Sequence, residues 1–534
     1  MRTVIVALVA GLASVLPAHG EVAELFGRAD AVWDAQVSPD GQHVALGCGP
    51  TGAKAVCIYS LVADKKPMVF YPGDDMRVQW FYWGGEDYVV TNVASLETLR
   101  TSAGLKQYDV RRAVSYSLET GKNALLMRDL GNWVDLTGLV STCDRKPGRI
   151  MMSVGYRASG DAPTGSRISG IGLGFRSELY EVNLKNGRTR KKPDRAASIA
   201  YQLLGTDCEP LVDVIYNDER KTYAIDKSDT RERIFALDDV DVWPMSVLGT
   251  TIDASALVVR ADYGDTYGMF SMSLADGAME PITYEGAELG RMGVVCDTFS
   301  DAVIGFRSTD DIEEHLYIDQ ELVDLQALVE GALPGQSARV LSFSRDRGLY
   351  TIEAEAPGVP RTFYLYDVAA TELSPLGALA PQTEGRALGT VEAVTYEARD
   401  GLEIPAYLTL PSGQTRDDGP FPTVLLPHGG PEARDTAAYD WWSQAYAAAG
   451  YAVLQPNFRG SAGYGKAFRD AGFGEFGGKM VDDVVDAIAW AEAEGVSDPR
   501  GVSVAGASYG GYSALMTALK APDMRWAVWW QSLR

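Results

Sequence analysis

A short strand followed by a polar turn recurs seven times along the first two thirds of the chain. The copies lie at residues 58–61, 116–118, 179–184, 222–225, 270–274, 315–318 and 363–367. They are spaced about 40 to 65 residues apart, the length of a four-stranded propeller blade. A second motif, VSPDG at 37–41, has an echo in FSRDR at 343–347. One such unit cannot bury both of its faces, so the units must stack in a ring. The sequence therefore predicts a β-propeller of about seven blades over residues 21–388, and the regular period argues against a pair of β-sandwiches.

The pattern changes near residue 390. Segments 390–396 and 404–410 read as an antiparallel pair around the turn Asp400-Gly401, and 421–427 is a continuous apolar strand. Strands at 451–456 and 501–505 alternate with helices at 439–449, 480–494 and 512–520. Alternating strands and helices predict a mainly parallel sheet with helices on both faces. We assign this second domain to residues 389–534.

The stretch VAGASYGG at 504–511 carries the strongest chemical signal. It matches G-x-S-x-G and lies between a predicted strand and a predicted helix, the context of the nucleophile elbow in α/β-hydrolases. The sharp turn exposes the hydroxyl of Ser508 at the edge of the sheet. Gly506 and Gly510 permit the close approach of strand and helix. We predict that Ser508 is a catalytic nucleophile; the alternative is a structural serine in a glycine-rich turn.

A second motif, HGGP at 428–431, follows the apolar strand that ends at Pro427. In α/β-hydrolases a loop of this kind donates one backbone N–H to the oxyanion hole, and the residue after the nucleophile donates another. We assign these donors to Gly430 and Tyr509. His428 and Gly429 then shape the loop, and His428 is not the general base.

Arg459, in NFRGSAGYG at 457–465, has two possible roles. Its guanidinium could bind a substrate carbonyl or carboxylate, or it could be a buried, paired group that braces the loops around the site. The second role is our expectation.

These stretches together resemble the prolyl oligopeptidase family, and within it the acylaminoacyl-peptidase-like branch. The matching residues are HGGP at 428–431, YDWWSQAYAAAGYAVLQPNFRGSAGYG at 439–465 and GASYGG at 506–511. The resemblance is close over about residues 390–524. In the preceding residues it concerns the propeller architecture, with little residue identity. It implies a serine peptidase acting on short peptides, with the active site between propeller and hydrolase domain, and no metal or organic cofactor. Exopeptidases of the family bind the substrate amino group with acidic propeller residues; Glu313 and Glu314 fit by composition, although acidic surface pairs are common.

The chain departs from the family pattern after Ser508. A serine hydrolase needs a base and an orienting carboxylate, in the chain order Ser, Asp or Glu, His. The four histidines, His19, His43, His315 and His428, all precede Ser508, and Asp523 comes too soon to lie on a later strand. The triad Asp and His are therefore absent. The Trp-rich stretch after Arg525 is atypical, so we expect a truncated chain with negligible peptidase activity.

Two other functions stay open on the sequence alone. The same elbow serves an esterase, which a comparison of peptide and ester substrates would distinguish. A non-catalytic protein could use the propeller as a binding scaffold, although the intact elbow and HGGP loop argue against it. The sequence leaves the oligomeric state open.

Charge, the N-terminus and the cysteines suggest where the protein acts. A net charge of −24 disfavours binding to nucleic acid or anionic lipid. Residues 1–20 combine Arg2, a short apolar run and small residues, which predicts a secretory signal cleaved after Gly20 and a secreted or periplasmic protein. No later segment is apolar enough to cross a membrane, so an integral membrane protein is not expected. Cys48 and Cys57 flank a turn and could pair, and the odd total of five cysteines leaves a free thiol.

Overall fold

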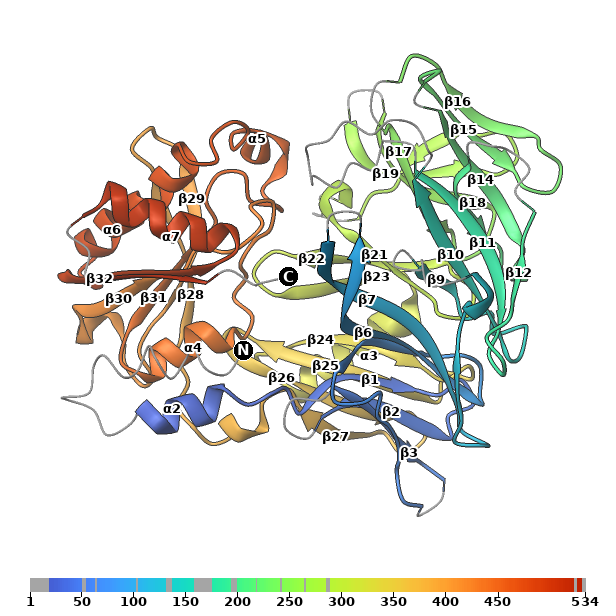
Figure 1. Ribbon diagram of the computed structural model, residues 1–534, viewed down its shortest axis with the longest axis horizontal. Helices are drawn as coiled ribbons and strands as arrows, with labels where there is room; N and C mark the ends of the chain where they lie inside the picture. The colour runs from blue at the N-terminus through green and yellow to red at the C-terminus, as the bar shows by residue number, and fades with distance from the viewer. Residues whose placement is uncertain are drawn as a thin grey trace.

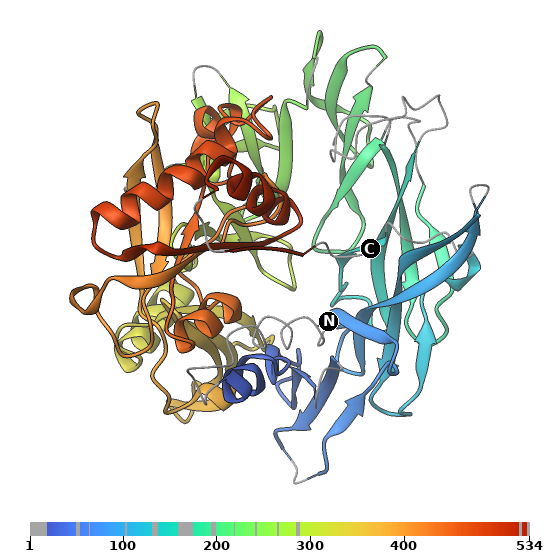
Figure 2. The ribbon, with the colours of Figure 1, turned by 60° about the vertical axis from the view of Figure 1, so that its left-hand side comes forward.

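The protein consists of a ring of small sheets and a helix-covered sheet, which lie side by side in the computed structural model (Figure 1 and Figure 2). The structure describes residues 19–49, 54–62, 65–101, 104–130, 137–157, 175–193, 199–217, 219–240, 243–263, 266–284, 289–522 and 526–530. Asp523 and Arg525 therefore lie outside the described residues, and so does the predicted signal segment except for its last two residues. No helix within these ranges is long and apolar enough to cross a membrane.

The ring contains seven antiparallel sheets, which confirms the predicted propeller. Blade 1 is β1 (Val32–Val37), β2 (His43–Cys48), β3 (Ala55–Ser60) and β4 (Met68–Phe70); blade 2 is β5 (Met76–Trp83), β6 (Tyr88–Thr101), β7 (Gly104–Ser117) and β8 (Asn123–Leu125). Blade 3 is β9 (Thr137–Ser141), β10 (Arg149–Arg157), β11 (Phe175–Asn183) and β12 (Thr189–Lys191); blade 4 is β13 (Ile199–Leu204), β14 (Pro210–Asn217), β15 (Thr222–Lys227) and β16 (Arg233–Leu237). Blade 5 is β17 (Met245–Thr250), β18 (Ala256–Tyr263), β19 (Thr266–Ser273) and β20 (Met279–Pro281). Blade 6 is β21 (Gly293–Cys296), β22 (Val303–Thr309) and β23 (Glu313–Tyr317); blade 7 is β24 (Ser337–Phe343), β25 (Leu349–Ala356), β26 (Val359–Asp367) and β27 (Glu372–Ala378).

The seven recurring sequence units coincide with the third strand of each blade, namely β3, β7, β11, β15, β19, β23 and β26. Blade 6 departs from the others because a helix, α3 (Gln320–Ala332), follows its third strand. Leu322, Leu325 and Val329 of this helix are buried at helical spacing in a core shared with Tyr317 and Val340. The amphipathic helix α3 therefore lies between two blades in a region for which we expected β-structure.

Among the described strands, blades 7 and 1 share none, because each blade is built from consecutive strands. The amide of Val37 donates to Ser342 Oγ at 2.9 Å, and Thr351 Oγ1 donates to Ala35 O at 2.9 Å. Phe363 of blade 7 packs in one core with the blade 1 side chains Ala35, Val44 and Leu46. The two related turns also meet, since the amide of Arg345 donates to Pro39 O at 2.8 Å.

The second unit is a six-stranded sheet in the order β28-β29-β31-β30-β32-β33. Its strands are β28 (Val391–Glu397), β29 (Glu403–Thr409), β30 (Phe421–Leu425), β31 (Ala452–Pro456), β32 (Ser497–Ala507) and β33 (Trp526–Trp530). Its helices are α4 (Trp441–Ala448), α5 (Gly465–Asp470), α6 (Lys479–Ala493) and α7 (Tyr509–Lys520). β28 and β29 are antiparallel to their neighbours, and the rest of the sheet is parallel. Helices α6 and α7 cover one face and α4 the other, as expected (Figure 1).

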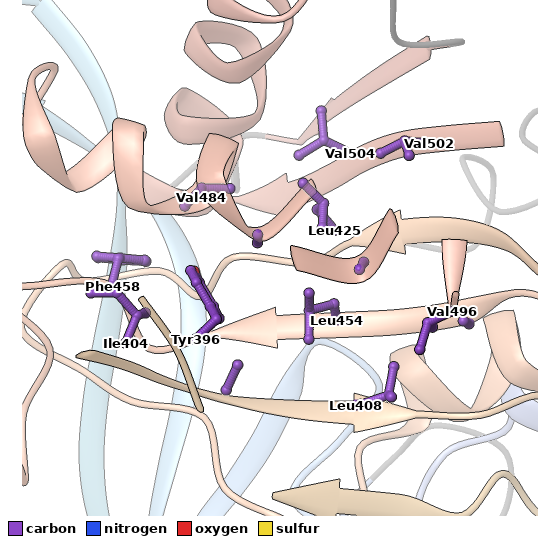
Figure 3. Close-up of a cluster of buried hydrophobic side chains, with 14 of the residues drawn as sticks. Tyr396, Ile404, Leu408, Leu425, Leu454, Phe458, Val484, Val496, Val502 and Val504 are labelled. Carbon is purple, nitrogen blue, oxygen red and sulfur yellow. The ribbon is translucent and has the colours of Figure 1, made fainter. Parts of the chain in front are cut away.

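The core of this unit lies between the parallel strands and helix α6 (Figure 3). Leu425, Leu454 and Val504 are fully buried on three neighbouring strands, and Val484 of α6 packs against them. Continuous apolar strands of this kind are typical of parallel sheets buried on both faces. The core fixes the strand ends, from which the candidate site is built.

Three further features bear on the sequence expectations. The Trp-rich stretch forms β33 and pairs in parallel register with β32, from Ser503↔Trp526 to Ala507↔Trp530. The boundary predicted at residues 388 and 389 falls between β27 and β28. Helix α2 (His19–Phe26) lies beside α4 (Figure 1), so the first described helix contacts the hydrolase-like unit rather than the ring alone.

Two disulfides are present. Cys48 and Cys57 pair across neighbouring strands of blade 1, and Cys143 pairs with Cys208, which joins the turns of blades 3 and 4. Cys296 is the free thiol among the described cysteines. Four short 3-10 turns complete the structure, at Arg128–Leu130, Leu289–Arg291, Pro381–Thr383 and Arg416–Asp418.

Candidate active site

Ser508 lies at a sharp turn between the end of β32 and the start of α7. Its backbone has φ 57° and ψ −122°, a conformation that a residue with a side chain rarely adopts. The residue is exposed, while Ala505, Gly506 and Tyr509 around it are buried. The turn therefore presents the hydroxyl at the sheet edge, as in a nucleophile elbow. The helix begins at Tyr509 rather than at the expected Tyr512.

The two glycines of the motif are required by close packing. A Cβ added to Gly506 would lie 2.3 Å from the carbonyl carbon of Gly510. A Cβ added to Gly510 would lie 2.1 Å from the carbonyl oxygen of Pro427. Both distances are far below any van der Waals contact, so strand, helix and the HGGP loop can meet only if these positions lack side chains.

The HGGP loop lies next to Ser508. Because β30 and β32 are parallel neighbours, with Leu425 paired to Val504, their carboxyl ends share one edge of the sheet. A Cβ built on Gly429 would lie 3.4 Å from Ser508 Cβ. Tyr509 is the first residue of α7, and the first amides of a helix have no intrahelical acceptor. The positive end of the helix dipole also lies here, which favours negative charge beside Ser508.

The ring of His428 is engaged by three groups of its own loop and the next one. Its ring nitrogens lie 2.7 Å from Gly429 O and 2.9 Å from Ser461 Oγ, and its ring stacks on Phe458 at 4.3 Å. Burial lowers the pKa of His428 to about 4. A neutral, fully engaged imidazole shapes the loop and is not available to accept a proton from Ser508.

The buried imidazole has a consequence for acid stability. The unfolded chain binds a proton at His428 near its ordinary pKa of 6.5, and the folded chain does so only near 4. The stabilisation is therefore complete above pH 6.5 and is lost as the pH falls toward 4, by up to about 3 kcal/mol. We expect the His428→Gln variant to lose less stability than the wild type between pH 6.5 and 4, measured by urea unfolding. An unchanged pH slope in the variant would contradict this assignment.

Arg459 is a buried, paired arginine. Its side chain is 5% exposed and forms two-pronged hydrogen bonds to Asp400 at 2.8 Å and to Asp483 at 2.7–3.1 Å. The side chain of Asp483, on α6, is fully buried. Hydrogen bonds from Arg459 and Lys479 hold the pKa of Asp400 well below its usual range. The guanidinium thus connects the β28–β29 turn, the loop after β31 and helix α6.

The described residues place no imidazole at Ser508. His315 belongs to blade 6, where Nδ1 contacts Tyr317 Oη at 2.8 Å and Nε2 contacts Glu313 at 3.3 Å. The hydrogen bond from His315 and the nearby charge of Arg339 lower the pKa of Glu313 to about 2. Glu313 is therefore already paired, and Glu314 is the exposed member of the acidic pair.

Two groups near the site carry no obvious sequence signal. Asp435 follows the HGGP loop, and burial together with the charge of Asp440 raises its pKa to about 8. Arg434 reaches from the same loop to the propeller, where its Nη2 donates to Asp310 O at 2.7 Å. A lone Arg-Asp pair after a glycine loop fits many exposed turns, so only the fold shows that both are enclosed.

No group of three or more His, Cys, Asp or Glu side chains in the described ranges could hold a metal ion. An exposed serine hydroxyl at a helix N-terminus, beside a glycine-rich loop, can act as a nucleophile toward a carbonyl carbon.

Comparisons with known proteins find similar sequences. Residues 437–531 match the family model described as the prolyl oligopeptidase family. Dipeptidyl aminopeptidase BIII of Pseudoxanthomonas mexicana is 28% identical over 517 residues, which cover 93% of this chain and 69% of that protein. Dipeptidyl peptidase family member 6 of Caenorhabditis elegans is 34% identical over 219 residues, 38% of this chain and 30% of that protein.

Solved structures show the same architecture. A puromycin-hydrolyzing peptidase of Mycobacterium tuberculosis has a TM-score of 0.63 at 16% identity, covering 94% of this chain and 78% of that one. A prolyl endopeptidase has a TM-score of 0.64 at 14% identity, covering 98% and 75%. At these identities the likeness concerns the fold alone.

Proposed function

This chain belongs to the prolyl oligopeptidase family, and on that premise we propose that Ser508 is the nucleophile of a serine peptidase that cleaves short peptides. The observation that carries the proposal is the conformation of Ser508, an exposed residue at φ 57° between a parallel strand and a helix. Strain of this size persists only where the surrounding structure enforces it, and it is typical of functional sites.

The proposed reaction proceeds through an acyl-enzyme. Ser508 Oγ bonds to the scissile carbonyl carbon while a base accepts its proton, and the carbonyl oxygen takes the negative charge. The amides of Gly430 and Tyr509 donate hydrogen bonds to this oxygen, each worth on the order of 10²–10³ in rate. The C–N bond then breaks, the leaving amine takes the proton, and water hydrolyses the ester to restore Ser508.

The base that this reaction needs is not assigned among these 534 residues. No histidine follows Ser508 in the sequence, and His428 is bonded to Ser461 and Gly429. We therefore expect negligible peptide turnover by protein of this sequence alone. Added imidazole should supply the base from solution, because Ser508 is exposed.

This expectation provides the test. Turnover of an activated dipeptidyl anilide is measured with and without imidazole, for the wild type and for Ser508→Ala. We expect a rate that rises with imidazole concentration in the wild type, above the rate with imidazole alone, and no such rise in Ser508→Ala. Equal rates in the two proteins at every imidazole concentration would refute the role of Ser508. Robust turnover without imidazole would refute the missing base.

For substrate class we propose the amino-terminal dipeptides of short peptides. The support is the names of the two curated relatives, a dipeptidyl aminopeptidase and a dipeptidyl peptidase family member. Glu314 is the exposed acidic residue of the predicted pair, and its pKa is raised by burial and by Glu330, Asp310 and Asp311. A preference for free dipeptidyl anilides over N-acylated ones would support this class, whereas a preference for simple esters would favour an esterase.

We also propose that the protein acts in a secreted or periplasmic setting. The two disulfides support this proposal, because disulfides persist in oxidising compartments.

A further inference from the structure

The segment that follows the HGGP loop lies between the hydrolase-like unit and the propeller. It contacts two propeller turns, one between β22 and β23 and the other between β25 and β26. We propose that Arg434 is a positioning residue through which the docked propeller holds the oxyanion loop beside Ser508. The role of this loop in catalysis rests on the proposed function, whereas the contacts of Arg434 do not depend on it.

Arg434 is almost enclosed at this junction, with a side chain that is 10% exposed. Its Nη2 donates to Asp310 O at 2.7 Å and to Tyr464 Oη at 3.0 Å, and its guanidinium lies 4.4 Å from the centre of the Tyr464 ring. The carboxylate of Asp310 is 82% exposed and lies 3.7 Å away. The bond to the backbone carbonyl therefore dominates, since exposed ion pairs contribute little.

Backbone hydrogen bonds extend the junction on both sides of Arg434. The amide of Ala437 donates to Asp311 O at 2.6 Å, and the amide of Gly358 donates to Ala437 O at 2.8 Å. Within the hydrolase-like unit, the amide of Ala462 donates to Ala433 O at 2.9 Å. The five residues from 433 to 437 thus bridge two propeller turns and the loop that holds Tyr464. Tyr407 Oη also donates to Asp311 Oδ1, at 2.8 Å.

This bridge begins three residues after Gly430, the proposed oxyanion donor. An oxyanion donor must lie about 2.7–3.1 Å from the developing charge, and a misplacement of about 1 Å can cost about 10²-fold in rate. If the propeller turn moves away, Arg434 loses its carbonyl partner and the loop loses its outer support. The propeller then serves as part of the scaffold of the oxyanion hole.

The test compares Arg434→Gln with two controls. Asp310→Asn keeps the backbone carbonyl that Arg434 binds, and Arg434→Lys keeps a cation of similar length. We expect Arg434→Gln to speed hydrogen–deuterium exchange at least about tenfold in peptides covering 428–440, while peptides from α6 and α7 keep their wild-type exchange. Asp310→Asn should match the wild type, and Arg434→Lys should recover part of the protection.

Imidazole-dependent turnover provides the second readout. We expect Arg434→Gln to lower kcat by about 10- to 100-fold with little change in KM, because the loop acts on the transition state rather than on substrate binding. Unchanged exchange at 428–440 in Arg434→Gln, or faster exchange throughout the protein, would overturn the inference. If imidazole supports no Ser508-dependent turnover, the proposed function fails, and the exchange experiment still decides whether Arg434 holds the loop.

Discussion

Arg459→Met is expected to lower the free energy of unfolding by about 3–5 kcal/mol, the cost of leaving a buried charge without its partner. Asp483 has no exposed side-chain surface, and Arg459 supplies its charged hydrogen bonds. Methionine fills a similar volume but cannot donate, so Asp483 must either ionise alone or take up a proton. The β28–β29 turn and helix α6 would lose their common anchor as well.

Urea unfolding followed by tryptophan fluorescence measures this effect. Arg399→Met is the matched control, because Arg399 also pairs with an acid of α6, Asp486, but is 52% exposed. It should cost less than about 1 kcal/mol. The double variant Arg459→Met/Asp483→Leu should recover much of the loss, since it removes both buried charges. Equal, small losses of unfolding free energy in Arg459→Met and Arg399→Met would show that the buried ion pairs stabilise the protein no more than the exposed pair does.

Gly510→Ala is expected to disrupt the elbow itself. The new Cβ would lie 2.1 Å from Pro427 O, and backbone atoms cannot move aside as a flexible side chain can. Helix α7 and the HGGP loop must then separate. Overpacking typically costs about 1–3 kcal/mol of the free energy of unfolding, and we expect a loss of at least about 3 kcal/mol here. Ser508 would then lose its place beside Gly429.

Gly331→Ala is the control for this substitution. Gly331 lies in helix α3, and a Cβ there would have no atom within 4 Å. It should stabilise the helix by about 0.5–1 kcal/mol, the usual preference for Ala over Gly in a helix. Both variants are compared by thermal unfolding. A Gly510→Ala protein that unfolds like the wild type would show that the elbow tolerates a side chain.

The propeller could be predicted because a strand followed by a polar turn recurs at regular spacing in the sequence. The seven units were found through their third strands, where apolar residues alternate and a polar turn follows. The repeat of strands does not predict helix α3. Its buried residues Leu322, Leu325 and Val329 follow the spacing of a helix instead of the alternation of a strand. Cys143 and Cys208 are 65 residues apart, so their pairing depends on the contact between blades 3 and 4.

The candidate site shows the same division. The turn at Ser508 follows from local sequence, since the G-x-S-x-G motif and its flanking elements together define it. The helix that follows begins three residues before the predicted Tyr512. Gly510 and Gly511 are typical of a turn, but here Gly510 lies in the helix because the packing leaves no room for a side chain. The contact of Arg434 with Asp310 joins residues 124 positions apart and depends on how two units dock. Local sequence patterns do not predict which residues of two different units come into contact.

The absence of a shared strand between the first and last blades has a consequence during synthesis. Blades emerge from the ribosome in order, and each contains its own strands. The apolar face of blade 1, with Val44 and Leu46, packs against Phe363, which is translated more than 300 residues later. At about 5–20 residues per second, this face waits roughly 15 to 60 seconds for its partner. Nascent chains of this protein should therefore need a chaperone most while the middle blades are being made.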